Sequence, residues 1–285
     1  MQYRSRDGDM DIKNNIVYVT FKETRKAVIR KIKLSQYLGD DYGCPVCGVR
    51  LKSFKPIWKS YRRKTAEMGY VYPLSSIETF NEDAYSCPSC DASDRERLFA
   101  LFFDEVFRGF DQGPRRRLVE FAPSTALRRR LSRHPQVAYR SADIIRQTVD
   151  DRVDITDMAL YPNNSIDIFL CSHVLEHVED DRKAMQEMFR ALRPGGFAVV
   201  MVPLIHGVEE THEDPAFNTP ELRWKYFGQD DHVRQYGKTD FVKRLTSAGF
   251  HVDQLGADYF GPDVFRRAGI AQDSILYVAR KTVPS

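Results

Sequence analysis

The sequence predicts an α/β protein in which helices cover both faces of a mostly parallel sheet, preceded by a small β-rich, zinc-binding module. Short apolar runs alternate with amphipathic segments from about residue 117 to residue 280, and this alternation is typical of parallel sheets. Two C-x-x-C pairs fall within the first 90 residues. The charge balance also changes along the chain, which indicates two parts of different character.

The charge distribution suggests where the chain divides. A chain of 285 residues can form one large domain or two ordinary ones. Residues 1–70 hold 16 Lys and Arg against 7 Asp and Glu, whereas the remaining residues hold 27 against 33. We therefore expect a basic N-terminal module over residues 1–94 and the main domain over residues 95–285. A basic surface can bind nucleic acid, anionic glycan or lipid phosphate, or can simply be a solvated face.

Hydropathy predicts a soluble, cytoplasmic protein without a membrane span. The first 15 residues lack the apolar stretch of a signal peptide. The longest apolar run, over residues 197–205, has nine residues, well short of the roughly 20 that cross a bilayer.

Four of the five cysteines form two pairs, Cys44 with Cys47 and Cys87 with Cys90. Together they offer the four thiolates of a closed, structural zinc site. A redox dithiol is the alternative for each pair, and disulfides are disfavoured in an intracellular protein. The 39 residues between the pairs exceed the ~15–20 of compact zinc sites, and they favour an inserted hairpin or loop. Cys171 is expected to be a buried small hydrophobe.

The secondary structure follows from periodicity and capping. A hairpin is expected over residues 10–34, leading into the cysteine module. Strands are predicted over residues 117–122, 136–144, 165–172, 197–204, 251–257 and 274–280, with a further short segment before Asp154. Helices are predicted over residues 93–110, 124–133, 180–193 and 238–250. The first helix begins at a Ser-Asp cap, and "PGG" ends the third.

Polar residues mark the ends of the predicted strands. In an open α/β sheet, ligands bind beyond the carboxyl ends of the strands. Glu120, Asp143 and Asp154 come at three such ends, and Ser172 and His173 end the next strand. Carboxylates placed in this way suit a ligand with hydroxyl groups and an amine. Each Asp could instead be a helix cap or turn residue.

Five motifs carry a family resemblance: "LVEFAPS", "SADI", "DIT", "DIFLCSHVLEHVEDD" and "ALRPGGFAVVMVP". Through them, residues 117–280 resemble a class I S-adenosylmethionine-dependent methyltransferase. The resemblance implies a Rossmann-like sheet of seven strands, S-adenosylmethionine as cofactor and S-adenosylhomocysteine as product. The family usually has a glycine-rich loop after the acid of the first strand, where this sequence has Ala122, Pro123 and Ser124.

The resemblance also implies roles for individual residues. Glu120 would hold the loop over residues 122–124 and, directly or through water, the amino group of the cofactor. Asp143 would accept both ribose hydroxyls. Further contacts would come from Asp154 to the adenine amino group, from Ile155 to the adenine ring, and from Ser172 and His173 to the methionine and sulfonium.

The connection over residues 204–237 is long for a compact domain and is expected to form a wall or lid over the methyl acceptor. A hydroxyl acceptor must lose a proton, and histidine is suited to take it near neutral pH. The candidate bases are His173, His206, His212 and His232. In "DDHVRQYG", His232, Arg234 and Tyr236 alternate and would share one face of an extended chain. We expect His232 to be the base or a substrate ligand and Arg234 to bind an anionic or hydroxylated group, with Tyr236 beside them.

Two other patterns could bind metal. "HVLEH" (residues 173–177) is the inverted zinc-protease motif H-x-x-E-H when it lies on one helix. Because His173 is expected to end a buried strand, it would not share a regular helix face with His177, and a metalloprotease is disfavoured. His177 is expected to cap or pack at the start of the next helix. The run "EETHED" (residues 209–214) could also bind a divalent ion.

The leading functional hypothesis is O-methylation of a sugar or other small polar metabolite. An RNA methyltransferase that binds phosphates through the zinc module is less favoured, because the chain lacks a known aromatic–basic recognition motif. A third hypothesis is a methyltransferase-like interaction protein that has lost cofactor binding, which the altered first loop suggests. The sequence does not predict an oligomeric state.

Overall fold

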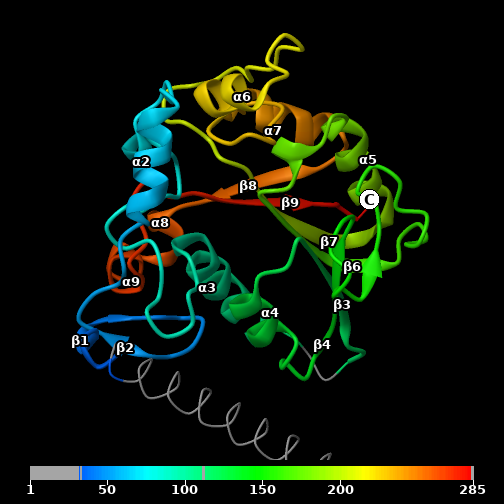
Figure 1. The fold of residues 1–285 in the computed structure, drawn as a ribbon. Coiled ribbons are helices and arrows are strands. Elements are labelled where there is room, and N and C mark those ends of the chain that lie inside the picture. The colour runs from blue at the N-terminus through cyan, green and yellow to red at the C-terminus, as the bar shows by residue number, and fades with distance from the viewer. Residues whose placement is uncertain (1–31, 33, 111–112, 284–285) are drawn as a thin grey trace, which may run out of the picture.

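A seven-stranded sheet forms the centre of the molecule (Figure 1). The computed structural model describes residues 32, 34–110 and 113–283. The strand order is β5-β4-β3-β6-β7-β9-β8. Neighbouring strands from β5 to β7 are parallel, whereas β9 pairs antiparallel with both β7 and β8. The expected Rossmann-like, mostly parallel sheet of seven strands is confirmed.

The strands of this sheet follow the predicted apolar runs. Their bounds are β3 Arg116–Phe121, β4 Val137–Asp143, β5 Asp151–Arg152, β6 Ile166–Ser172, β7 Leu192–Met201, β8 His251–Leu255 and β9 Leu276–Arg280. The central strands are buried on both sides, as expected for a sheet between two layers of helices. The hairpin expected over residues 10–34 lies outside the described residues, apart from residues 32 and 34.

Helices cover both faces of the sheet, as predicted. Figure 1 shows α3 (Asp94–Arg108) and α4 (Thr125–Leu131) on one side, with α5 (Asp181–Ala191) and α7 (Lys238–Ser247) on the other. Helix α3 begins with a capping box in which Ser93 and Glu96 exchange hydrogen bonds with each other's backbone. Further short helices are α6 Pro220–Phe227, α8 Ala257–Phe260 and α9 Pro262–Ala268. Within the described ranges, none of the helices combines the length and apolar character that a bilayer span requires.

The N-terminal module holds a small antiparallel sheet of β1 (Leu38–Gly43) and β2 (Arg50–Leu51). The hairpin or loop expected between the cysteine pairs is wrong, because this segment contains helix α2 (Lys59–Glu67) and a 3-10 turn, η1 (Leu74–Ser76). The run "KSYRRKTAE" has no glycine or proline, and it is rich in residues that favour helix. Length alone therefore gave no guide to its conformation.

Arg97 joins this module to the main domain. The side chain is fully buried, and the guanidinium lies 3.9 Å from the centroid of the Phe54 ring. Arg97 donates to the carbonyl oxygens of Ala92 (3.0 Å) in the module and of Ala268 (2.6 Å) and Gly269 (3.0 Å) at the C-terminal end of α9. These charge-assisted hydrogen bonds from one buried guanidinium connect the module to the main domain. The division at residue 94 stays a prediction.

The segment between the cysteine pairs, residues 55–85, crosses the edge of the sheet, and we call it the roof segment. The backbone N–H of Glu78 donates to the Leu204 carbonyl (2.8 Å), and the backbone N–H of His206 donates to the Ser76 carbonyl (2.8 Å). The Tyr277 hydroxyl on β9 donates to the buried Glu78 carboxylate at 2.7 Å. These bonds hold the roof segment just beyond the carboxyl end of β7, where an α/β sheet binds its ligands.

Candidate active site

The predicted cofactor residues lie along one edge of the sheet. Glu120, Asp143 and Ser172 stand at or next to the carboxyl ends of the neighbouring parallel strands β3, β4 and β6. Asp154 follows β5 by two residues. Because the carboxyl ends of adjacent parallel strands meet at one edge, these groups border the same crevice. Their contacts with a cofactor stay predictions.

Asp143 forms a tight turn at the end of β4. Its Oδ1 accepts hydrogen bonds from the backbone N–H groups of Ile145 (2.8 Å) and Arg146 (3.0 Å), and its Oδ2 lies 3.5 Å from Arg146 Nε. The Arg146 guanidinium also donates to the Pro123 carbonyl at 2.8 Å. Arg146, which the sequence did not single out, therefore connects the expected ribose acid to the loop over residues 122–124.

The loop that replaces a glycine-rich turn contains a left-handed residue. Ala122 has a φ of 46°, a conformation that costs alanine about 1 kcal/mol. The Ser124 side chain caps α4 by accepting from Leu127 N (3.2 Å). Glu120 is buried under the loop, where its carboxylate accepts from Ser124 N (3.3 Å) and from the Tyr139 hydroxyl (2.5 Å).

Burial raises the pKa of Glu120 to about 7, although the hydrogen bond from Tyr139 opposes the shift. In the unfolded chain the pKa is 4.5, so between these values the folded chain holds more protons and its stability falls as the pH rises. We expect Glu120→Gln to leave the free energy of unfolding almost unchanged at pH 5. At pH 8 the variant should be more stable than the wild type, by up to about 3 kcal/mol.

Urea unfolding of the cofactor-free chain at both pH values measures this difference. Asp263→Gln, an exposed acid on α9, is the control and should show no such pH dependence. An equal effect of Glu120→Gln at pH 5 and pH 8 would contradict the assigned burial.

The next two predicted residues differ in exposure. Asp154 is exposed, and its Oδ1 accepts from both the backbone N–H and the hydroxyl of Thr156 at 2.8 Å. This turn leaves Oδ2 free of those bonds and able to accept from an adenine amino group. Ile155 is buried, with 6% of its surface exposed, so only an edge of its side chain could reach a ring.

His173 lies at the turn that follows β6. Its φ is 54°, and its backbone N–H donates to the Met201 carbonyl at the end of β7 (2.8 Å). Its Nδ1 lies 3.2 Å from Oε1 of Glu176, in the short 3-10 turn η2 (Leu175–His177). Burial, together with the nearby Arg95 guanidinium, lowers the pKa of His173, so the imidazole is neutral near pH 7. His173 and His177 do not share a regular α-helix, and the protease motif therefore has no support in the backbone.

The residues of "DDHVRQYG" do not share one face. His232 is buried, and its Nδ1 lies 2.8 Å from the Phe227 carbonyl. The Arg234 guanidinium instead donates to the carbonyls of Leu175 (3.0 Å) and Glu179 (2.9 Å), and the fully buried Tyr236 donates to Asp181 (2.5 Å). The expected contact of Arg234 and Tyr236 with an acceptor does not fit this placement, because both side chains hold η2 and α5 in position.

The other histidines and acids of this connection also have local partners. His206 Nε2 lies 2.9 Å from Asp273 Oδ2, and the exposed His212 packs on the aromatic ring of Phe217. Glu213 of "EETHED" is paired with Arg234 and Arg244, each at 2.7 Å. A carboxylate neutralised by two guanidinium groups is a poor metal ligand. His177 does not cap α5, since Asp180 occupies that position.

A cavity of about 390 Å³ lies between the sheet edge and the roof segment. We call it the aromatic cavity; its walls include Tyr61, Tyr70, Phe80, Tyr85 and Trp224, with Arg95, His173, His177 and His232 as polar groups. Sequence reasoning missed the contribution of the roof segment and of Arg95. Tyr70, Phe80 and Tyr85, the three aromatic residues over residues 70–85 that line it, lie between the two cysteine pairs. No periodicity in the sequence indicates that they face a ligand.

The side chains of the four paired cysteines lie close together. Cys44 Sγ lies 3.8 Å from Cys90 Sγ, Cys47 Sγ lies 3.8 Å from Cys87 Sγ, and all four sulfur atoms lie within 4.8 Å of one another. Tetrahedral zinc with Zn–S bonds of about 2.3 Å requires separations of about 3.8 Å. Both pairs sit in equivalent turns, which end in the left-handed residues Gly48 and Asp91. The arrangement fits a zinc ion.

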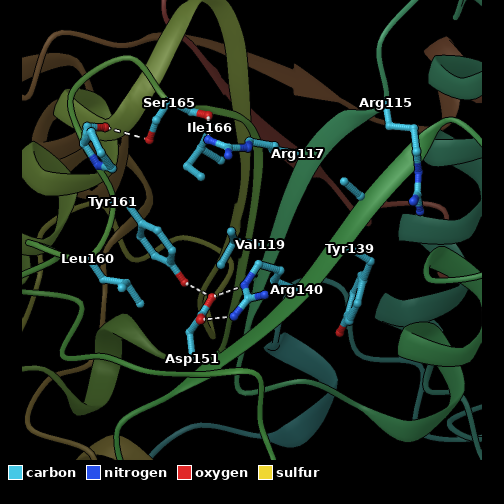
Figure 2. Close-up of a pocket in the computed structure, with 12 residues that line it drawn as sticks. Arg115, Arg117, Val119, Tyr139, Arg140, Asp151, Leu160, Tyr161, Ser165 and Ile166 are labelled. Carbon is cyan, nitrogen blue, oxygen red and sulfur yellow. Dashed lines mark hydrogen bonds and ion pairs between the residues drawn. The ribbon is translucent and has the colours of Figure 1, made fainter.

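Figure 2 shows a second pocket, on the face of β3 and β4. The acid that lines it, Asp151, accepts hydrogen bonds from Arg140 Nε (2.6 Å) and from the Tyr161 hydroxyl (2.9 Å). Arg117 donates to the Ser165 carbonyl at 3.4 Å. The polar groups of this pocket bind one another, and the pocket includes the first residues of β3 rather than its carboxyl end. It is therefore less suited than the aromatic cavity to bind a cofactor and a methyl acceptor.

Comparison with known proteins decides the family. The family model described as "Methyltransferase domain" matches residues 86–255. The chain belongs to this methyltransferase family. The matched region contains the strand-end acids, His173 and the second cysteine pair.

A curated relative from Mycolicibacterium smegmatis, named "Probable S-adenosylmethionine-dependent methyltransferase", is 31% identical over 112 residues, or 39% of this chain. The match spans about a third of the relative's length, 36%. Solved structures are similar at lower identity. They are the [4+2]-cyclase SpnF (16% identity, 79% of this chain and 92% of that chain, TM-score 0.43) and the methyltransferase domain of the citrinin polyketide synthase (18%, 71% and 56%, TM-score 0.45). Likeness at these TM-scores does not single out either activity for the present chain.

Proposed function

We propose that this methyltransferase family member transfers a methyl group from S-adenosylmethionine to a hydroxyl of a sugar or other small polar metabolite. One observation carries the proposal: His173 belongs both to the sheet edge that is expected to hold the cofactor and to the wall of the aromatic cavity. A base at that junction can reach the acceptor oxygen while it faces the methyl donor.

The residues at the sheet edge fit the cofactor. Asp143 would accept the ribose hydroxyls, Asp154 the adenine amino group, and Glu120 would hold the loop below the amino acid part. When bound there, S-adenosylmethionine supplies an electrophilic methyl group on a sulfonium. His173 would lie beside it, with its Nδ1 turned toward Glu176 and its Nε2 left to take the acceptor proton.

The aromatic cavity would hold the acceptor. Aromatic rings such as those of Tyr61 and Trp224 can pack against the C–H face of a sugar, while the histidines bind its hydroxyl groups. Arg95 contributes a positive charge, and its Nε has no hydrogen-bond partner within the described residues. We assign to Arg95 the anion- or hydroxyl-binding role that the sequence suggested for Arg234.

Zinc would bind the four cysteines as a structural ion. Both ends of the roof segment would then be fixed by the same ion, since one cysteine pair precedes the segment and the other follows it. The roof segment supplies much of the aromatic wall, so the metal would shape the acceptor site without contacting the acceptor.

Cofactor binding is tested with Asp143→Asn. Asparagine keeps an oxygen for the turn bonds from Ile145 and Arg146, but it removes the charge that strengthens bonds to ribose hydroxyls. Loss of about 1.5–3 kcal/mol corresponds to roughly a 10- to 100-fold weaker affinity for S-adenosylhomocysteine in calorimetry. Asp263→Asn on α9 is the matched control and should bind as the wild type does. Failure of the wild type to bind at high micromolar concentration would leave the interaction-protein hypothesis.

A further inference from the structure

A second cluster of metal-ligand side chains adjoins the aromatic cavity, whose wall includes His177 and His232. One carboxylate oxygen of Glu176 and one ring nitrogen each of His177 and His232 lie within 4.8 Å of one another. Glu176 and His177 belong to η2, and the backbone N–H of Val233 donates to the Glu176 carbonyl (2.8 Å). This bond fixes the segment that carries His232 against η2.

The cluster holds buried polar atoms without partners. Glu176 has no exposed surface, and within the described residues its Oε2 has no hydrogen-bond partner, while Oε1 has only His173 Nδ1 beside it, at 3.2 Å. Nε2 of the buried His232 also has no partner there. A buried carboxylate of this kind is costly unless a cation or a donor satisfies it. A cation between these atoms would satisfy both Glu176 Oε2 and His232 Nε2.

The other nitrogen of each histidine is already occupied. His232 Nδ1 lies 2.8 Å from the Phe227 carbonyl, and His177 Nδ1 lies 3.2 Å from Asp231 Oδ2. Metal-binding histidines generally donate one ring N–H to such an oxygen, which fixes the tautomer and leaves the other nitrogen to the ion. Both rings are held in this way, so both Nε2 atoms are available as ligands.

We propose that Glu176, His177 and His232 bind a divalent first-row transition metal ion, such as Mn²⁺, Fe²⁺ or Zn²⁺, in the wall of the acceptor site. Two imidazole nitrogens and one carboxylate suit these ions better than Ca²⁺ or Mg²⁺, which prefer oxygen ligands. Bonds of about 2.0–2.2 Å place ligand atoms about 3–4 Å apart, so small side-chain rotations would complete the site.

Three protein ligands would leave the ion able to bind a further group, and His177 and His232 line the aromatic cavity. This part of the inference rests on the proposed function: the open position would bind the acceptor hydroxyl and lower its pKa. The hydroxyl proton would pass to His173, the oxygen would bond to the methyl carbon, and the carbon–sulfur bond would break with its electron pair left on sulfur. The motif "HVLEH" would then have a metal role, through Glu176 and His177 rather than through its first histidine.

The test measures Mn²⁺ binding to the full chain with zinc retained in the four-cysteine site. Thiolates are poor ligands for Mn²⁺, so the four cysteines should not take up this ion. The paramagnetic resonance signal of the free aqua ion measures the Mn²⁺ that remains unbound. We expect one bound Mn²⁺ per wild-type chain and at least tenfold weaker binding by Glu176→Gln and by His232→Asn. Glu221→Gln on α6 and His251→Asn on β8, both exposed, are matched controls and should bind as the wild type does.

The outcomes separate the inference from the proposed function. Absence of Mn²⁺ binding by a wild type that still binds S-adenosylhomocysteine would overturn the metal site alone. Equal binding by wild type and Glu176→Gln would also overturn it. Displacement of Mn²⁺ by an equal concentration of Ca²⁺ would overturn the assigned ion class. If folding of a variant is in question, Mn²⁺ should raise the unfolding temperature of the wild type and of Glu221→Gln, but not that of Glu176→Gln.

Discussion

Removal of the zinc ion proposed for the four cysteines is expected to disorder the roof segment over the proposed acceptor site. The strand ends that are proposed to hold the cofactor should stay folded. Cys44 and Cys87 are buried in a small apolar cluster with Leu51 and Phe54, too few side chains to fold a module without further help. Structural zinc contributes on the order of 10 kcal/mol to such modules. Cys87→Ser should lose most of this free energy.

The two tryptophans provide the measurement. Trp58 packs against Tyr85 (centroids 5.5 Å apart), and Trp224 packs against Tyr61 (6.3 Å). Because the chain has only these two tryptophans and both line the aromatic cavity, their fluorescence reports on the roof rather than on the sheet. A chelator or Cys87→Ser should shift the emission to longer wavelength, and affinity for S-adenosylhomocysteine should fall far less.

Cys171→Ala is the matched control, because Cys171 is buried in β6 and is not part of the cluster. It should keep one zinc per chain and the native emission. Unchanged tryptophan fluorescence in a zinc-free wild type would show that the roof does not depend on the metal. Retention of stoichiometric zinc by Cys87→Ser would show that the four thiols do not form the site.

The sequence predicted the fold correctly where the hydrophobic runs and the helix caps indicated the same strands and helices. The runs "RLVEFA", "SIDIFLCS" and "FAVVMVPL" are short and mostly apolar, which favours buried strands. The cap at Ser93 marked the start of α3 correctly. The roof segment was misjudged, because a cysteine spacing constrains the ends of a segment and says nothing of its interior. Only the helix-favouring composition of "KSYRRKTAE" indicated that this segment contains a helix.

The site was readable only in part. Strand ends can be ordered from the sequence, so Asp143 and His173 could be placed on one edge of the sheet. Alternation could not place Arg234 and Tyr236, because residues 230–236 are not an extended strand and their side chains turn to the carbonyls of η2 and to Asp181. The cluster of Glu176 with His232 joins residues 56 positions apart, a contact that depends on the tertiary path of the connection.

His173→Asn is expected to abolish most methyl transfer without a comparable loss of cofactor affinity. Asparagine tolerates the left-handed backbone that His173 adopts, with φ of 54°, so the turn after β6 should persist. The variant loses the imidazole that takes the acceptor proton, which is worth about 10²- to 10⁴-fold in rate. Radioactive methyl transfer from S-adenosylmethionine to a panel of sugars and nucleoside-linked sugars gives the rate.

The control for this change is His212→Asn, the same substitution at another candidate base. His212 is exposed, packs on Phe217 and does not line the aromatic cavity, so its loss should leave the rate near that of the wild type. The reverse pattern, a slow His212→Asn and an active His173→Asn, would move the base to the long connection. The acceptor site would then not have to lie at the end of β6, because a base on that connection need not face the methyl donor. The position of His173 at the meeting point of sheet edge and cavity thus determines whether one residue can serve both substrates.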